Sequence, residues 1–214
     1  AVWETLYVTV VATLFAYVIG LPLGVLAVAG EEGGVLPLPR PVMAVINFVI
    51  NILRSVPFLI LMVIVIPLSR LIIGTSIGTV ATIIPLIVAA FPFVARLVEA
   101  SIREVDKGVI EAAQSMGCSP FQIIWKVMLP ESRPSLISGF PTAFITILSY
   151  GAMAGAIGGG GLGSMALNLG YQRQMEGKVR DELAQQQREQ ILRTQIRVLQ
   201  NELGEDEDNE IDEY

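Results

Sequence analysis

The chain has 214 residues, of which 53% are hydrophobic and only 16% are charged, and its mean hydropathy is +0.63. This composition is too apolar for an ordinary soluble domain of that length. The formal net charge of −6 comes from the C-terminal part, because residues 1–171 hold eight basic and eight acidic side chains whereas residues 172–214 hold six and twelve. The sequence has no basic patch of the kind that binds nucleic acid.

The residue types that carry most enzyme chemistry are missing. The sequence has no histidine, no nucleotide-binding glycine loop and no nucleophile elbow. Its single cysteine, Cys118, excludes an internal disulfide and is interpreted as a small filler rather than a reactive thiol. We therefore expect no catalytic site, no metal site and no cofactor.

Four apolar blocks are long enough to cross a bilayer, which takes about 20 residues in a helix. They are residues 6–29, 42–68, 76–95 and 135–157. The sequence therefore predicts an all-α membrane protein with about four spans. Gly20, Pro22 and Gly24 are expected to bend or loosen the first block, which membrane helices tolerate when their neighbours satisfy the freed backbone groups.

The second block is interrupted by Arg54, and Pro57 follows three residues later. We expect residues 42–54 to form a helix along or near the interface and residues 55–68 to lie deeper. A charge inside a membrane is costly and usually functional, so Arg54 is a candidate for lining a substrate path. Snorkelling to the headgroups is the favoured interpretation. Other candidates for the path, for which ordinary packing is the favoured explanation, are Ser149, Tyr150 and Met153.

Residues 104–131 form a polar segment between the third and fourth blocks, which we call the elbow. Asp106 suits the N-cap of a first helix. That helix is expected to stop at Gly117, because glycine adopts the left-handed conformation without a Cβ clash.

A second short helix is predicted after Gly117. Ser119 and Gln122 have the spacing of a capping box, and Pro120 occupies the first helical position. Pro130 is expected to end this helix. Local physics alone leaves two interpretations of the elbow equal: a docking device for a partner, or a connector on the membrane surface.

The distribution of Lys and Arg in short loops predicts the orientation. With four spans, residues 29–41 and 96–133 lie on one side and hold six basic residues, whereas the other side has only Arg70 before the tail. The elbow is therefore expected in the cytoplasm, with residue 1 outside.

Five glycines fall within residues 158–163. Because each glycine costs about 1 kcal/mol in a helix, this segment is expected to be a flexible turn just outside the membrane, or a plain linker.

The composition changes again at about residue 174. Residues 174–204 are expected to form an amphipathic helix that ends at Gly204, and residues 205–214 an acidic, disordered end. Leu192, Ile196, Leu199 and Leu203 form a two-heptad apolar stripe, which is short of a secure coiled coil. A solvated helix packed on its own chain and a seam between two copies remain equal alternatives.

The elbow contains a spaced set of residues that resembles the EAA signature of binding-protein-dependent ABC importer permeases of type I. The matching residues are Glu111, Ala112, Ala113, Gly117, Val127, Leu129 and Pro130, with valine at 127 where the family usually has isoleucine. The resemblance implies that the elbow is the coupling loop, which sits in a groove of a cytoplasmic ATPase subunit. The permease itself would then have no catalytic site.

Residues 2–173 as a whole are similar to the methionine branch of these permeases. The similarity is carried by residues 3–6, 51–58, 74–78, 92–96, 159–163 and 170–173. It implies a multi-pass subunit of an ATP-driven importer in the bacterial plasma membrane. Two copies would line the path, an ATPase dimer would drive it, and an extracytoplasmic binding protein would deliver the substrate.

The tail departs from that family, which places a fifth span after residue 173. Residues 187–192 and 200–205 instead resemble a helical segment of Lon-type proteases. Four spans put the tail outside, where such a segment does not belong. Either the chain is a fusion without its last span, or the fourth block does not cross. The alternative function is a truncated, non-transporting membrane protein whose helical tail mediates association.

Overall fold

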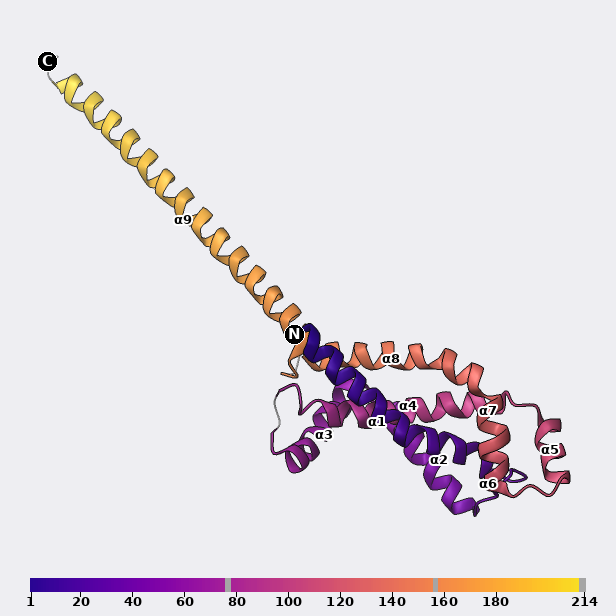
Figure 1. The fold of residues 1–214 in the computed structure, drawn as a ribbon. Coiled ribbons are helices and arrows are strands. Elements are labelled where there is room, and N and C mark those ends of the chain that lie inside the picture. The colour runs from indigo at the N-terminus through magenta and orange to yellow at the C-terminus, as the bar shows by residue number, and fades with distance from the viewer. Residues whose placement is uncertain (76–77, 156–157, 212–214) are drawn as a thin grey trace. The chain divides into compact units, whose positions relative to one another are not determined.

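The computed structural model describes residues 1–75, 78–155 and 158–211, and every regular element in them is a helix (Figure 1). The chain divides into two compact units, Ala1–Ala166 and Leu167–Tyr214. In order, the elements are α1 (Val2–Ala29), α2 (Arg40–Ser55), α3 (Phe58–Ile73), α4 (Ile83–Arg103), α5 (Lys107–Ser115), α6 (Pro120–Ile123), the π-helical turn η1 (Ile124–Met128), α7 (Leu129–Glu131), α8 (Arg133–Gly155) and α9 (Gly161–Ile211).

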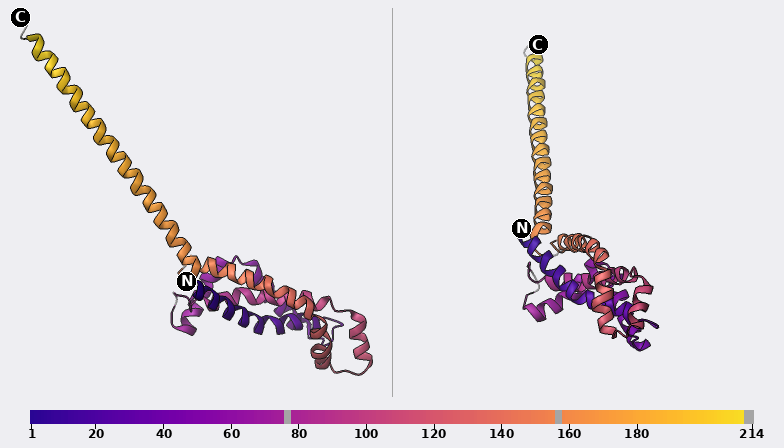
Figure 2. Two further views of the ribbon diagram at one scale, coloured as in Figure 1. Left: turned by 45° about the horizontal axis from the view of Figure 1, so that its top comes forward. Right: turned by 45° about the vertical axis from the view of Figure 1, so that its right-hand side comes forward.

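Helices α1, α4 and α8 form the centre of the first unit, and both views in Figure 2 show them side by side. Glycine makes the contact between α1 and α4 close, as is common where membrane helices meet. A Cβ on Gly24 would lie 2.5 Å from the carbonyl oxygen of Ala95, and one on Gly20 would lie 2.8 Å from Cγ1 of Val94. The glycines expected to loosen the first span are therefore contact points for α4.

The prediction of about four spans is confirmed. Within the described residues, α1, α4 and α8 are long and apolar enough to cross a membrane, and α2 with α3 forms a fourth candidate that is bent by 113°. The bend lies at Val56 and Pro57, as the sequence predicts, because a proline keeps the preceding residue extended. The third span begins at Ile83 rather than near Ser76, which lies outside the described residues.

Contacts at the two ends of the bundle show that α1 and α4 run parallel. At one end, Arg103 at the end of α4 binds Glu31, which lies two residues after the end of α1. At the other end, Thr82 before α4 donates to the carbonyl of Gly159, and the N–H of Gly161 donates to Glu4. The intervening α2–α3 pair therefore returns along the full length of the bundle, as a span does.

The glycine segment differs in part from its prediction. Gly158, Gly159 and Gly160 lie outside helices, but α9 already begins at Gly161, and the prediction of a turn to residue 163 is wrong there. The reason is a cap supplied by α1. Glu4 Oε2 accepts from the N–H of Gly161 at 3.2 Å, and Thr5 Oγ1 accepts from the N–H of Leu162 at 2.9 Å, so the first turn has acceptors for its free N–H groups.

The second unit consists of the remainder of α9. Its side chains from Leu167 to Leu199 are exposed, and Glu189 pairs with Arg193 one turn later at 2.8 Å. The helix continues past Gly204, where the sequence predicts an end, to Ile211, within the segment predicted to be disordered. One glycine costs about 1 kcal/mol, which by itself is too little to stop a long helix. The seam and the solvated helix remain alternatives.

Candidate functional site

The first helix of the elbow is built as its sequence predicts. Asp106 caps α5 and accepts from the N–H of Gly108 at 2.6 Å. Gly117 follows the end of the helix with φ of 78°, which is the left-handed conformation, and its N–H donates to the carbonyl of Gln114. The chain turns there without a side-chain clash.

The second helix starts with the predicted capping box. The N–H of Gln122 donates to Ser119 Oγ, and the N–H of Ser119 donates to Gln122 Oε1 at 2.9 Å. Two free donors at the start of α6 are thereby satisfied, and the turn between α5 and α6 is held from both sides.

Pro130 does not end this helix, contrary to the prediction. The chain continues from α6 through η1 into α7, which ends at Glu131. In η1 the N–H of Leu129 donates to the carbonyl of Ile124, one residue further back than in an α-helix. Pro130 therefore lies inside a continuous helical run, directly after the π-helical turn, where the α-helical hydrogen-bond pattern is already interrupted, and the run ends one residue later.

One face of the elbow is anchored in the hydrophobic core. Ala113 is 3% exposed, and Ile123 and Met128 are each 1% exposed. All three belong to the same buried cluster as Val98 and Ile102 of α4. The elbow therefore shares the buried core of the spans and is not attached by its two chain connections alone.

The opposite face shows large apolar side chains to solvent. Met116 is 76% exposed, Phe121 69% and Trp125 58%, and the rings of the two aromatic residues lie 6.2 Å apart. Exposed aromatic residues close together on a polar segment mark a surface that contacts another protein or a membrane surface. The sequence interpretation missed Phe121 and Trp125, although their i, i+4 spacing in a polar helix was a usable signal.

The signature residues divide between these two faces. Glu111, Ala112 and Gly117 are exposed, and Ala113 is buried. The three residues of the second part, Val127, Leu129 and Pro130, are half-buried. Glu111, Ala112 and Gly117 thus contribute to the exposed face of the elbow. Ala113, Val127, Leu129 and Pro130 connect the elbow to the bundle.

A cavity of about 570 Å³ lies between the elbow and the loop that follows α1. Its wall includes Glu31, Gly33, Arg103, Lys107, Glu111 and Met128. The elbow is therefore packed on α4 but separated from the α1–α2 loop by open space.

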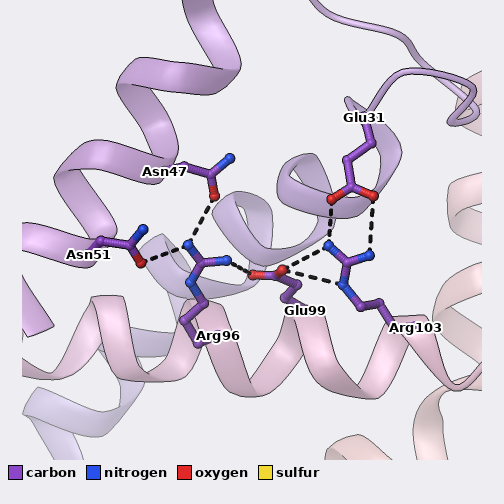
Figure 3. Close-up of polar contacts among 6 residues, drawn as sticks. All are labelled: Glu31, Asn47, Asn51, Arg96, Glu99 and Arg103. Carbon is purple, nitrogen blue, oxygen red and sulfur yellow. Dashed lines mark hydrogen bonds and ion pairs between the residues drawn. The ribbon is translucent and has the colours of Figure 1, made fainter. Parts of the chain in front are cut away.

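A polar cluster joins three elements beside this cavity (Figure 3). Arg96 donates to the side-chain oxygens of Asn47 and Asn51 of α2 at 3.0 and 2.9 Å, and pairs with Glu99. Glu99 also accepts from Arg103 at 3.0 Å, and Arg103 pairs with Glu31 through both of its terminal nitrogens. The sequence interpretation missed this cluster, although the i, i+3 and i, i+4 spacing of Arg96, Glu99 and Arg103 indicated it.

The candidates for the substrate path lie on α2 and α8. Arg54 is exposed near the end of α2. On α8, Tyr150 stacks on Phe58 with ring centres 4.5 Å apart, and Ser149 donates to the carbonyl of Ile145 in its own helix. Met153 is 49% exposed. Among the described residues, no hydrogen bond or ring contact joins Arg54 to these α8 residues.

Comparisons with known proteins agree with this architecture. The chain is 48% identical over 173 residues to the probable D-methionine transport system permease protein MetI of Vibrio cholerae, covering 81% of this chain and 76% of that protein. It is 46% identical over 154 residues to the D-methionine transport system permease protein MetI of Escherichia coli (strain K12), covering 72% of this chain and 70% of that protein.

A solved structure described as an inward-facing conformation of the MetNI methionine ABC transporter has a TM-score of 0.76 and 46% identity over 79% of this chain and 78% of that chain. A structure of an amino acid ABC transporter with histidines, at 23% identity and a TM-score of 0.64, shares the fold. The family described as "Binding-protein-dependent transport system inner membrane component" matches residues 20–179. The chain therefore belongs to the family of binding-protein-dependent transport system inner membrane components.

Proposed function

We propose that this chain is the membrane permease subunit of an ATP-driven importer for methionine in the bacterial plasma membrane. The observation that carries the proposal is the elbow, which is anchored in the core by Ala113 and Met128 and presents Phe121 and Trp125 to solvent. Relatives at 48% and 46% identity are named D-methionine transport permeases, which supports methionine as the substrate.

The partner of the elbow is a cytoplasmic ATPase subunit. Its docking surface on this chain consists of Glu111, Ala112, Met116, Phe121 and Trp125, which are all exposed. Apolar and aromatic side chains supply most of the binding energy in such an interface, and Glu111 adds a charge for basic groups of the partner. A solved structure similar to this chain is described as a MetNI methionine ABC transporter, which supports this assembly.

The elbow passes motion to the spans without doing chemistry itself. ATP binding and hydrolysis belong to the ATPase dimer. The caps at Asp106 and Ser119 make the elbow stiff, and its buried face lies against α4 and the start of α8. A movement of the elbow therefore displaces these spans as a body, which alternately opens the path between two copies of the permease to either side. An extracytoplasmic binding protein supplies methionine.

The proposed domain boundaries follow from the same assignment. Residues 1–173 form the permease domain, with residues 104–131 as its coupling loop, and the family match over residues 20–179 supports this extent. Residues 174–204 and 205–214 form a helical tail and an acidic end. Arg54, Ser149, Tyr150 and Met153 stay candidates for the substrate path.

A second candidate function rests on α9. From residue 174 to residue 199 this helix is exposed and rich in charged residues, whereas the resemblance implies another apolar span there. The alternative is accordingly a permease-like membrane protein that does not transport and associates with other proteins through α9.

Co-expression with a methionine-type ATPase subunit tests the docking surface. We expect the wild-type chain to retain the ATPase in a pull-down, and Phe121→Ser with Trp125→Ser to lose it. Trp3→Ser is the matched control, because Trp3 is an 81% exposed aromatic residue at the opposite end of the bundle. Equal retention by the wild-type chain and the elbow variant would refute the proposed docking surface. Assembly without methionine uptake would favour the second candidate.

A further inference from the structure

Helix α2 combines limited apolar burial with two hydrogen bonds to α4. Ile50 is the one buried residue among the sixteen of α2, all of which the structure describes. On the same face, Asn47 and Asn51 accept hydrogen bonds from Arg96 of α4. Met43, Ile46 and Leu53 are only half-buried, so the two hydrogen bonds from the guanidinium of Arg96 add to a small apolar contact in positioning α2.

Arg96 belongs to a series of alternating charges that runs toward the elbow. Its terminal nitrogen pairs with Glu99, whose side chain is 11% exposed, and Glu99 in turn binds Arg103. Arg103 is held between Glu99 and Glu31 (Figure 3). Arg96 and Glu99 are the enclosed members, whereas the side chains of Arg103 and Glu31 are 46% and 45% exposed, so the loss of a partner is most costly at Glu99.

The series ends where the elbow begins. Arg103 is the last residue of α4, and Asp106, which caps α5, lies three residues further along the chain. The cavity of about 570 Å³ is lined by Glu31 and Arg103 on one side and by Glu111 of the elbow on another. The elbow thus has room to move against the loop after α1, and such a movement acts on Arg103 through residues 104 and 105, which join Arg103 to Asp106.

We infer that movement of the elbow is transmitted to α2 by this series of polar contacts. The series consists of Glu31, Arg103, Glu99, Arg96, Asn47 and Asn51. Arg96 is the positioning residue that keeps α2 on α4. Helix α2 continues across the bend at Pro57 into α3, which packs on α4 and α8. A displacement of α2 therefore also moves α3 relative to α4 and α8. The inference rests on the proposed function, since it assigns the route by which the docked ATPase acts on this helix.

The test uses the complex of the full chain with its ATPase in proteoliposomes. Asn47→Leu with Asn51→Leu removes the link to α2 and leaves all charged pairs intact, so it separates positioning from folding. Arg96→Lys retains the charge but reaches fewer acceptors at once. The matched control is Arg40→Ala, which removes the exposed pair between Arg40 and Glu32 at the start of the same helix.

We expect the asparagine variant to hydrolyse ATP at the wild-type rate but to import about tenfold less methionine per ATP, within the usual range of coupling between sites. The uptake per ATP of Arg96→Lys should lie between that of the wild type and that of the asparagine variant. The uptake per ATP of Arg40→Ala should equal that of the wild type. Unchanged uptake per ATP in the asparagine variant, or a parallel loss of hydrolysis and uptake, would overturn the inference.

A second readout does not depend on transport. With Cys118 replaced by serine, Ile50→Cys places a single thiol at a position that is 1% exposed between α2 and α4. A water-soluble thiol reagent should label it about tenfold faster when Asn47→Leu and Asn51→Leu are present than when they are absent. Equal labelling rates with and without the two asparagine substitutions would contradict the role of Arg96. If the substitutions speed labelling but the wild-type complex takes up no methionine, only the proposed function is refuted.

Discussion

At the scale of single residues, glycine determines where backbones approach and where they turn. Gly24 lies against Ala95 and Val98 of α4, whereas Gly151 of α8 has its nearest foreign atom, Thr9 Oγ1, at 4.0 Å from a built Cβ. The two glycines thus differ in the space that they leave for a Cβ.

We expect Gly24→Leu to separate α1 from α4 and to lower the stability of the bundle by about 1–3 kcal/mol, the usual cost of overpacking. Gly151→Ala should fold normally. Thermal unfolding of the purified chains in detergent measures both. A wild-type melting temperature for Gly24→Leu would show that the close contact between α1 and α4 does not stabilise the bundle.

Gly117 differs from these glycines, because a Cβ there meets no atom within 4 Å but the backbone has φ of 78°. A β-branched residue in that conformation costs about 1–2 kcal/mol or forces the turn between α5 and α6 to change. We expect Gly117→Val to disturb the angle of the elbow and to uncouple ATP hydrolysis from uptake. Wild-type uptake per ATP in vesicles that hold the full complex would refute this role of the turn.

At the scale of elements, the described residues of α9 beyond Leu167 are exposed as far as Leu199 and contribute nothing to the core of the first unit. We expect a chain that ends at residue 173 to retain both the fold of the bundle and the docking of the ATPase. Thermal unfolding and the pull-down measure this, and loss of either would show that the tail is part of the permease.

The stripe of Leu192, Ile196 and Leu199 provides a separate test of the tail. If α9 forms a seam between two copies, replacing these three exposed residues by serine lowers the oligomeric state of a soluble fragment of residues 174–214. Light scattering measures the mass. A monomeric wild-type fragment would exclude the seam and leave the solvated helix.

The sequence predicts the positions of the helices better than the contacts between distant segments of the chain. Apolar length indicates the spans, and capping chemistry places the starts of α5 and α6 at Asp106 and Ser119, because both signals are local. The early start of α9 at Gly161 depends on Glu4 and Thr5, which lie more than 150 positions away in the chain. The cluster around Arg96 likewise joins three elements, and no local pattern identifies Asn47 and Asn51 as its acceptors.

At the scale of the whole bundle, the parallel course of α1 and α4 determines the topology. The segment between them returns from the end at Glu31 to the end at Thr82, so α2 and α3 act together as a crossing. With four crossings, we expect the elbow and the loop after α1 on one side of the membrane, and residue 1 and Gly161 on the other.

We expect a membrane-impermeant maleimide to label Leu162→Cys in intact spheroplasts, and Lys107→Cys only after lysis, with Cys118 replaced by serine in both. Leu162 is 41% exposed and Lys107 is exposed, so access to either thiol depends on the side of the membrane. The reverse pattern would contradict the cytoplasmic elbow, and labelling of both in intact cells would contradict the four crossings.

The most direct test of the permease assignment is ATP-dependent uptake of labelled methionine. The proteoliposomes contain this chain, a methionine-type ATPase subunit and the corresponding binding protein. We predict uptake that requires ATP and all three components. An assembled complex that hydrolyses ATP but accumulates no methionine would contradict the assignment.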